Sequence, residues 1–101
     1  MRYEFDAEVW RWAARVEEWA FVSLPREASE EIREYIGDLA RGFGSVRVEC
    51  RIGDGDRETV WRTSIFPGGD GVYVLPLKKA VRKAHDLAIG ARTRVRLEVL
   101  D

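Results

Sequence analysis

The chain has 101 residues, a length that suits one domain with a single hydrophobic core. Hydrophobic residues make up 46% of the chain and charged residues 35%, a balance that excludes a disordered protein. The net charge of −1 excludes a general attraction to nucleic acid or to anionic membranes. We therefore expect one soluble, independently folding domain over residues 1–101.

The first residues of the chain alternate apolar and charged side chains and lack the continuous apolar run of a signal peptide. No later stretch reaches the roughly 18 uninterrupted apolar residues that a membrane span needs. We therefore predict a cytoplasmic protein with no membrane partner.

Cys50 is the only cysteine and His85 the only histidine, which limits the chemistry of any active site. A lone cysteine excludes an intrachain disulfide and a thiolate metal cluster, and we expect it to be buried and inert. An enzyme would need a buried lysine, or His85 with a carboxylate such as Asp86. Adjacent helical residues point in different directions, so that pair is poorly placed. We predict no catalytic residues, no metal and no cofactor, and catalysis is the least expected function.

Six segments have the alternation or composition of β-strands. They are residues 3–9, 18–24, 45–52, 58–66, 72–75 and 94–99. In the first strand the alternation places Trp10 and Trp12 on the charged side, where we expect them to be partly covered because exposed apolar patches are usually small. Pro25 has no N–H for a ladder hydrogen bond, so the second strand should stop there.

Two helices are predicted, over residues 26–41 and 77–87. The first should end near Gly42 and presents an acidic face, formed by Glu27, Glu30, Glu31, Glu34 and Asp38. The second presents a basic face, formed by Lys78, Lys79, Arg82 and Lys83. Cations in a first helical turn and like charges four residues apart each cost a few tenths of a kcal/mol. Such violations are expected where a ligand or partner compensates for them.

The two halves of the sequence repeat a common pattern. Val9-Trp10-Arg11 precedes Val60-Trp61-Arg62 by 51 residues, and Leu24-Pro25 precedes Leu75-Pro76 by the same interval. The element order strand, strand, helix, strand also occurs twice. We therefore predict a duplicated ββαβ unit whose two copies pair into a mainly β, six-stranded, pseudo-symmetric barrel capped by the two helices.

Three runs of sequence carry a resemblance to a known family. They are residues 42–48, residues 61–67 and residues 73–84, the last containing Leu-Pro-Leu-Lys-Lys-Ala-Val-Arg-Lys-Ala. Together they resemble the bacterial DUF1905 family over essentially the whole chain. The resemblance implies a double-split β-barrel, a fold that AbrB-like DNA-binding proteins also use, and it implies no activity for any residue.

The basic helix face is the strongest functional signal in the sequence. We predict a binding module for an anionic small molecule, contacted by Lys78, Lys79, Arg82 and Lys83, with Trp61 or Tyr73 available for stacking. A nucleic-acid-binding barrel of AbrB-like type is an alternative, although four cations are few for a duplex. Another is a homo-oligomer that pairs acidic helix 26–41 with basic helix 77–87. Trp10 and Trp12 offer a competing interface if they are uncovered, and a charged helix face can also be merely solvated.

Overall fold

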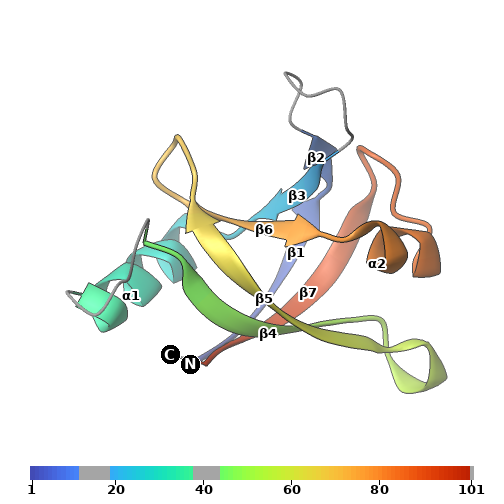
Figure 1. Cartoon of the computed structure of the whole chain (residues 1–101), viewed down its shortest axis with the longest axis horizontal. Helices are drawn as coiled ribbons and strands as arrows, with labels where there is room; N and C mark the ends of the chain where they lie inside the picture. Colours follow the sequence, from blue (N-terminus) through green and yellow to red (C-terminus); the bar gives the residue numbers. More distant parts are fainter. Residues whose placement is uncertain (12–18, 38–43, 101) are drawn as a thin grey trace.

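A computed structural model describes residues 1–11, 19–37 and 44–100 of the chain. In this part of the protein seven antiparallel strands form one sheet, curved into a half-barrel, with two α-helices beside it (Figure 1). The strands are β1 (Arg2–Glu8), β2 (Trp10–Arg11), β3 (Ala20–Ser23), β4 (Val46–Ile52), β5 (Thr59–Pro67), β6 (Tyr73–Leu77) and β7 (Arg92–Val99). The helices are α1 (Arg26–Ile36) and α2 (Lys79–Ala84), and a short 3-10 helix, η2 (Gly55–Arg57), joins β4 to β5. The predicted class, mainly β with two helices, is confirmed.

The strand order is β1-β7-β4-β5-β6-β3-β2, so the two ends of the order are strands that are neighbours in the chain. Only Val9 separates β1 from β2. Its N–H donates to the carbonyl oxygen of Ala91, and its own carbonyl accepts from the N–H of Gly90, each at 2.8 Å. The next residues pair with β3 instead. Because the chain changes pairing partner here, β2 forms as an additional short strand beyond the predicted strand 3–9, and the sheet has seven described strands where six were predicted.

The core lies on the concave side of the sheet and follows the predicted alternation. Every second residue is buried in β1 from Phe5 onward, in β4 from Val46 onward and in β7 from Val95 onward. Cys50 is completely buried, as predicted. Burial, followed by the negative charge of Glu49, raises the pKa of its thiol to about 12. The thiol is therefore protonated at neutral pH and unreactive.

The segment around Pro76 differs from the prediction, because β6 continues through this proline to Leu77. On one side β6 pairs with β3 along its length as far as Leu77, but β5 reaches only Tyr73 and Val74 on the other. Pro76 therefore lies beyond the end of β5, where the sheet has an edge and a missing N–H is tolerated. As a result α2 begins at Lys79, two residues later than predicted.

Both helices are shorter than their predicted lengths, because each ends in the left-handed region. Gly37, with φ of +50°, ends α1 at Ile36 instead of near Gly42. Asp86, with φ of +53°, follows the end of α2 and lets the N–H of buried Leu87 reach the carbonyl oxygen of Arg82 at 2.8 Å. Two residues named in the predictions, Trp12 and Asp38, lie outside the described residues. None of the described helices is long and apolar enough to cross a membrane.

Candidate functional site: an aromatic groove beside a basic ledge

The outer face of β3 and β6 carries apolar side chains where an antiparallel sheet usually presents polar ones to water. On β6 the inward residues Leu75 and Leu77 are buried, while Val74 and Pro76 point outward and are half-buried. On β3 the outward residue is Phe21, which faces Pro76 across the strand pair. The strands therefore have an apolar surface on both sides, and the outer one is not part of the main core.

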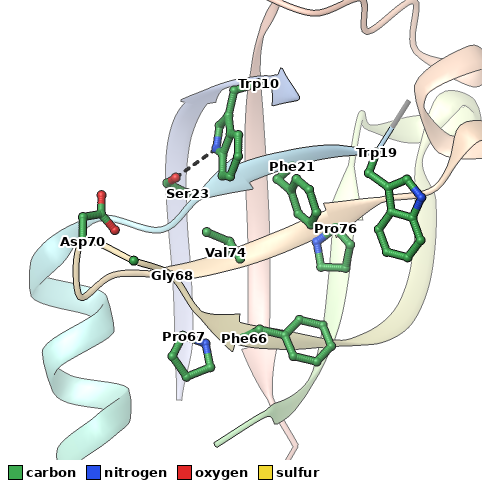
Figure 2. A pocket seen from close by; sticks show the side chains of 11 residues that line it. Trp10, Trp19, Phe21, Ser23, Phe66, Pro67, Gly68, Asp70, Val74 and Pro76 are labelled. Carbon is green, nitrogen blue, oxygen red and sulfur yellow. Dashed lines mark hydrogen bonds between the residues drawn. The ribbon is translucent and has the colours of Figure 1, made fainter. Parts of the chain in front are cut away.

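A groove of about 550 Å³ lies on this outer face, and we call it the aromatic groove (Figure 2). Its floor and walls come from β2, β3, the end of β5, β6 and the loop between β5 and β6. The apolar side chains that line it are Trp10, Trp19, Phe21, Phe66, Pro67, Val74 and Pro76. This volume falls within the range of pockets for small molecules, which are typically about 300–1,000 Å³ and mostly apolar.

The aromatic rings of the groove are packed on one another at one end and open at the other. Phe21 lies between Trp10 and Trp19, with ring centroids 5.0 Å and 6.5 Å away and rings tilted by 30° and 33°. The indole N–H of Trp10 donates to Ser23 Oγ at 3.0 Å, which fixes this ring. Trp19 and Phe66 remain 52% and 42% exposed. The site therefore has a fixed aromatic base and accessible rings at its rim.

The loop that closes the other end of the groove is held in place by close backbone contacts. The N–H of Gly68 donates to the carbonyl oxygen of Val72 at 2.7 Å. A Cβ atom at Gly68 would lie only 2.8 Å from that same oxygen, so the tight approach requires glycine. From α1, Arg33 Nη2 donates to the carbonyl oxygen of Gly71 at 2.6 Å. This end of the groove is therefore preorganised by the helix behind it.

Three of the predicted cations lie together in a second depression next to the groove. Lys78, Lys79 and Arg82 line a hollow of about 580 Å³ whose wall includes Trp19 and Pro76, which also line the aromatic groove. We call these three residues the basic ledge. Arg82 is half-buried and its Nε donates to the carbonyl oxygen of Leu77 at 3.2 Å, whereas both lysines are exposed. Cationic groups thus border one end of an apolar groove.

The other predicted binding residues lie elsewhere. Lys83 is exposed on α2 and does not line either hollow. Trp61 and Tyr73 are 7% and 3% exposed in the core, away from the basic ledge. The guanidinium of Arg33 lies 5.6 Å from the centre of the Tyr73 ring, so this ring already has a cation beside it. The indole Nε1 of Trp61 is buried without a hydrogen-bond partner among the described residues.

The groove aromatics Trp19, Phe21 and Phe66 were not recognised from the sequence. The available signal was the strand register that places Trp10 on the charged side of its strand. The proposed repeat makes Trp10 equivalent to Trp61, yet the two occupy different environments. Trp10 pairs with Phe21 on the outer face, whereas Trp61 pairs with Cys50 in β4 and is buried.

The remaining predictions from the sequence concern His85, metal binding and the two charged helices. His85 is half-buried, and its Nε2 lies 2.8 Å from Thr59 Oγ1, outside the aromatic groove. The described residues contain no group of three or more potential metal ligands. Helices α1 and α2 lie at opposite ends of the molecule (Figure 1), so their opposite charges do not meet within one chain. Association between copies through these helices stays a prediction.

The family profile described as Domain of unknown function (DUF1905) matches residues 5–97, nearly the whole chain. The chain belongs to the DUF1905 family. A search of curated proteins finds no match. DUF1905 membership confirms the resemblance drawn from the sequence and brings no assigned activity, so any function must be argued from the groove and ledge themselves.

Proposed function

We propose that this DUF1905 domain binds a small amphipathic anion. The apolar body of the ligand would lie in the aromatic groove, and its anionic group would contact Lys78 and Lys79 of the basic ledge. The observation that carries the proposal is that the two hollows adjoin, because they share Trp19 and Pro76 as walls. Neither an apolar body alone nor an anion alone would use both.

The chemistry of the two hollows supports different parts of such a ligand. Burying an apolar chain in the groove contributes about 25 cal/mol for each Å² removed from water. An exposed lysine adds little, about 0.2–1 kcal/mol for each charge pair, but it selects an anion and fixes the orientation of the ligand. Affinity would therefore come mainly from the groove and specificity from the ledge.

Titration calorimetry with undecanoate, a saturated carboxylate, tests the proposal. We expect a measurable heat of binding. In a parallel fluorescence titration the ligand should quench or shift the tryptophan emission, since Trp10 and Trp19 line the groove. The double variant Lys78→Gln/Lys79→Gln should weaken binding by about threefold to tenfold. Lys83→Gln is the matched control, because this lysine is also exposed on α2 and lies outside the ledge.

A second pair of variants tests the apolar part of the site. Phe66 and Val60 are both on β5, with exposed fractions of 42% and 44%, but only Phe66 lines the groove. Phe66→Ser should weaken undecanoate binding, and Val60→Ser should not. Equal affinity in all variants, or binding of duplex DNA that undecanoate does not displace, would contradict the proposal.

We further propose that the half-barrel is a double-split barrel built from a duplicated unit. Exchanging β1 and β2 with β5, β3 with β6, and β4 with β7 swaps the β1–β7 pairing with β4–β5 and the β2–β3 pairing with β5–β6. It maps the β3–β6 and β4–β7 pairings onto themselves, which supports this architecture. In the proposed barrel β5 pairs first with β4 and then with β6, as β1 and β2 pair first with β7 and then with β3. The aromatic groove lies where β5 and β6 part, so the split would create the binding site.

A further inference from the structure

The aromatic groove carries opposite charges at its two ends. The carboxylate-bearing residue Asp70 lines the end formed by the loop between β5 and β6, and Trp19 lines the other end (Figure 2). At the Trp19 end the groove meets the basic ledge with Lys78 and Lys79. A ligand that fills the groove from end to end would therefore meet an anion at one end and cations at the other.

The Asp70 carboxylate forms no ion pair with the described residues around it. Its Oδ1 accepts one long hydrogen bond, 3.4 Å from the backbone N of Val72. The nearest guanidinium contact, from Arg26 Nη2, goes to the main-chain oxygen of Asp70 at 3.3 Å and not to the carboxylate. The side chain is exposed, while its backbone is held by the loop contacts to α1. The carboxylate can therefore accept hydrogen bonds from a ligand at a fixed place.

The two charged ends are separated by the length of β6. From Val74 to Lys78 the chain advances four residues, which corresponds to about 13 Å in an extended strand. Charges on the surface are screened over about 10 Å in roughly 0.1 M salt. Asp70 and the lysines are therefore far enough apart to act on separate groups of one ligand rather than to cancel each other.

We propose that the preferred ligand is a zwitterion, with an ammonium group at Asp70, an apolar body in the groove and a carboxylate at Lys78 and Lys79. This rests on the proposed function and adds a second contact of opposite sign. An apolar peptide of about four residues with free termini has this chemistry and length, because an extended chain rises about 3.3 Å per residue. An ω-amino fatty acid has the same chemistry without peptide groups.

Calorimetric titration of ω-aminoundecanoate, undecanoate and undecylamine into the full chain tests the zwitterion. We expect ω-aminoundecanoate to bind about threefold more tightly than undecanoate, the gain of one exposed charge pair. Asp70→Asn keeps an acceptor for the Val72 N–H and should abolish this preference, so that ω-aminoundecanoate and undecanoate bind this variant with equal affinity. Asp56→Asn, in η2 and outside the groove, is the matched control and should preserve it.

A parallel series identifies the source of the zwitterion. An apolar tetrapeptide with free termini is compared with its N-acetylated and its C-amidated forms. Loss of affinity on capping either end, together with tighter binding than ω-aminoundecanoate, would support a peptide ligand. The affinity that the peptide loses on N-acetylation should not be lost in Asp70→Asn. The affinity that it loses on C-amidation should not be lost in Lys78→Gln/Lys79→Gln.

The outcomes separate this inference from the proposed function. If undecanoate binds as tightly as ω-aminoundecanoate and Asp70→Asn changes neither affinity, the zwitterion is overturned while the binding of an amphipathic anion stands. If no probe of either series binds, both are overturned. A preference for undecylamine over both other probes would also overturn the zwitterion, because it would leave the ledge without a role.

Discussion

The two halves of the sheet have the same inward face and opposite outward faces. On β1, β7 and β4 the outward residues are charged and paired across the strands, as in Glu4 with Arg94 at 2.9 Å and Arg94 with Asp6 at 3.2 Å. On β2, β3 and β6 the outward residues that line the groove are aromatic or apolar, apart from Ser23. In both halves the side chains alternate between the inward and the outward face. This alternation explains the core, but it does not explain why the outward residues of the two halves differ.

The difference between these faces indicates where the fold leaves room for function. Cross-strand ion pairs keep the first half hydrated and contribute little to stability, because exposed pairs of this kind are worth about 0–1 kcal/mol. Hydrogen bonds with Glu4, then with Asp6, raise the pKa of Arg94, whose charge is thus used within the face. On the aromatic face, by contrast, Trp19 and Phe66 remain 52% and 42% exposed. The proposed binding role would use these rings, and three stability experiments test the contrast between the two faces directly.

Phe21→Ala should give the largest effect on stability. Although Phe21 is on the outer face, only 6% of it is exposed, because Trp10 and Trp19 cover it. Removing a buried phenylalanine leaves a cavity, and we expect a loss of about 3 kcal/mol in the free energy of unfolding, measured by urea denaturation. Arg94→Ala on the ionic face is the comparison. It should change the free energy of unfolding much less, as an ordinary surface substitution does. A small effect of Phe21→Ala would mean that the aromatic face is as dispensable as the ionic one.

Ser29→Ala should give the next largest effect, because it removes the support behind the groove. Ser29 Oγ is completely buried and accepts the backbone N–H of Tyr73 at 2.9 Å, which anchors the start of β6 to α1. The variant leaves a buried donor unsatisfied, at a cost of about 1–3 kcal/mol. Ser23→Ala is the matched control, since its partner Trp10 is only part-buried and its N–H can turn to water. Equal losses in the two variants would show that the anchor to α1 carries no special weight.

Much of the ionic half could be predicted from the sequence, because it depends on local alternation. The inward residues that begin at Phe5, Val46 and Val95 are buried as expected. Cys50 is one of them, and its burial makes its thiol inert. The placement of Lys78 and Lys79 at the start of α2 could also be predicted, because charge at a helix start is a local property.

The aromatic groove could not be predicted, because it depends on contacts between distant segments. Phe21 becomes part of a groove only because β3 pairs with β6 and β2 pairs with β3, registers that no local pattern fixes. Pro76 remains in a strand only because β5 ends its pairing at Val74. The lengths of the helices depended on single residues, Gly37 and Asp86, whose left-handed conformations compete with helical propensity. The groove thus arises from pairing between distant strands, whereas the core follows from the alternation of apolar and polar residues along each strand.

The smallest expected effect concerns the ionic half at high pH. Tyr3 OH donates to Glu31 at 3.0 Å, and its pKa is raised to about 12 by burial, then by this hydrogen bond and by the charge of Glu31. The raised pKa means that the folded protein holds this proton after the unfolded chain has lost it near pH 10.0. The contribution to stability is therefore complete below pH 10.0 and is lost as the pH rises through about 12.

Tyr3→Phe should remove this part of the pH dependence. Denaturation profiles between pH 10.0 and about 12 should be flatter for the variant than for the natural protein, although Cys50, with its pKa also raised to about 12, keeps some decline in both. Tyr35→Phe removes a 57% exposed phenol from α1 and should retain the slope of the natural protein. Undecanoate binding should be equal in all three proteins at neutral pH, since neither tyrosine lines the groove. A profile in Tyr3→Phe as steep as that of the natural protein would show that the contact between β1 and α1 does not govern stability at high pH. A changed undecanoate affinity in either tyrosine variant would show that the two faces are not functionally separate.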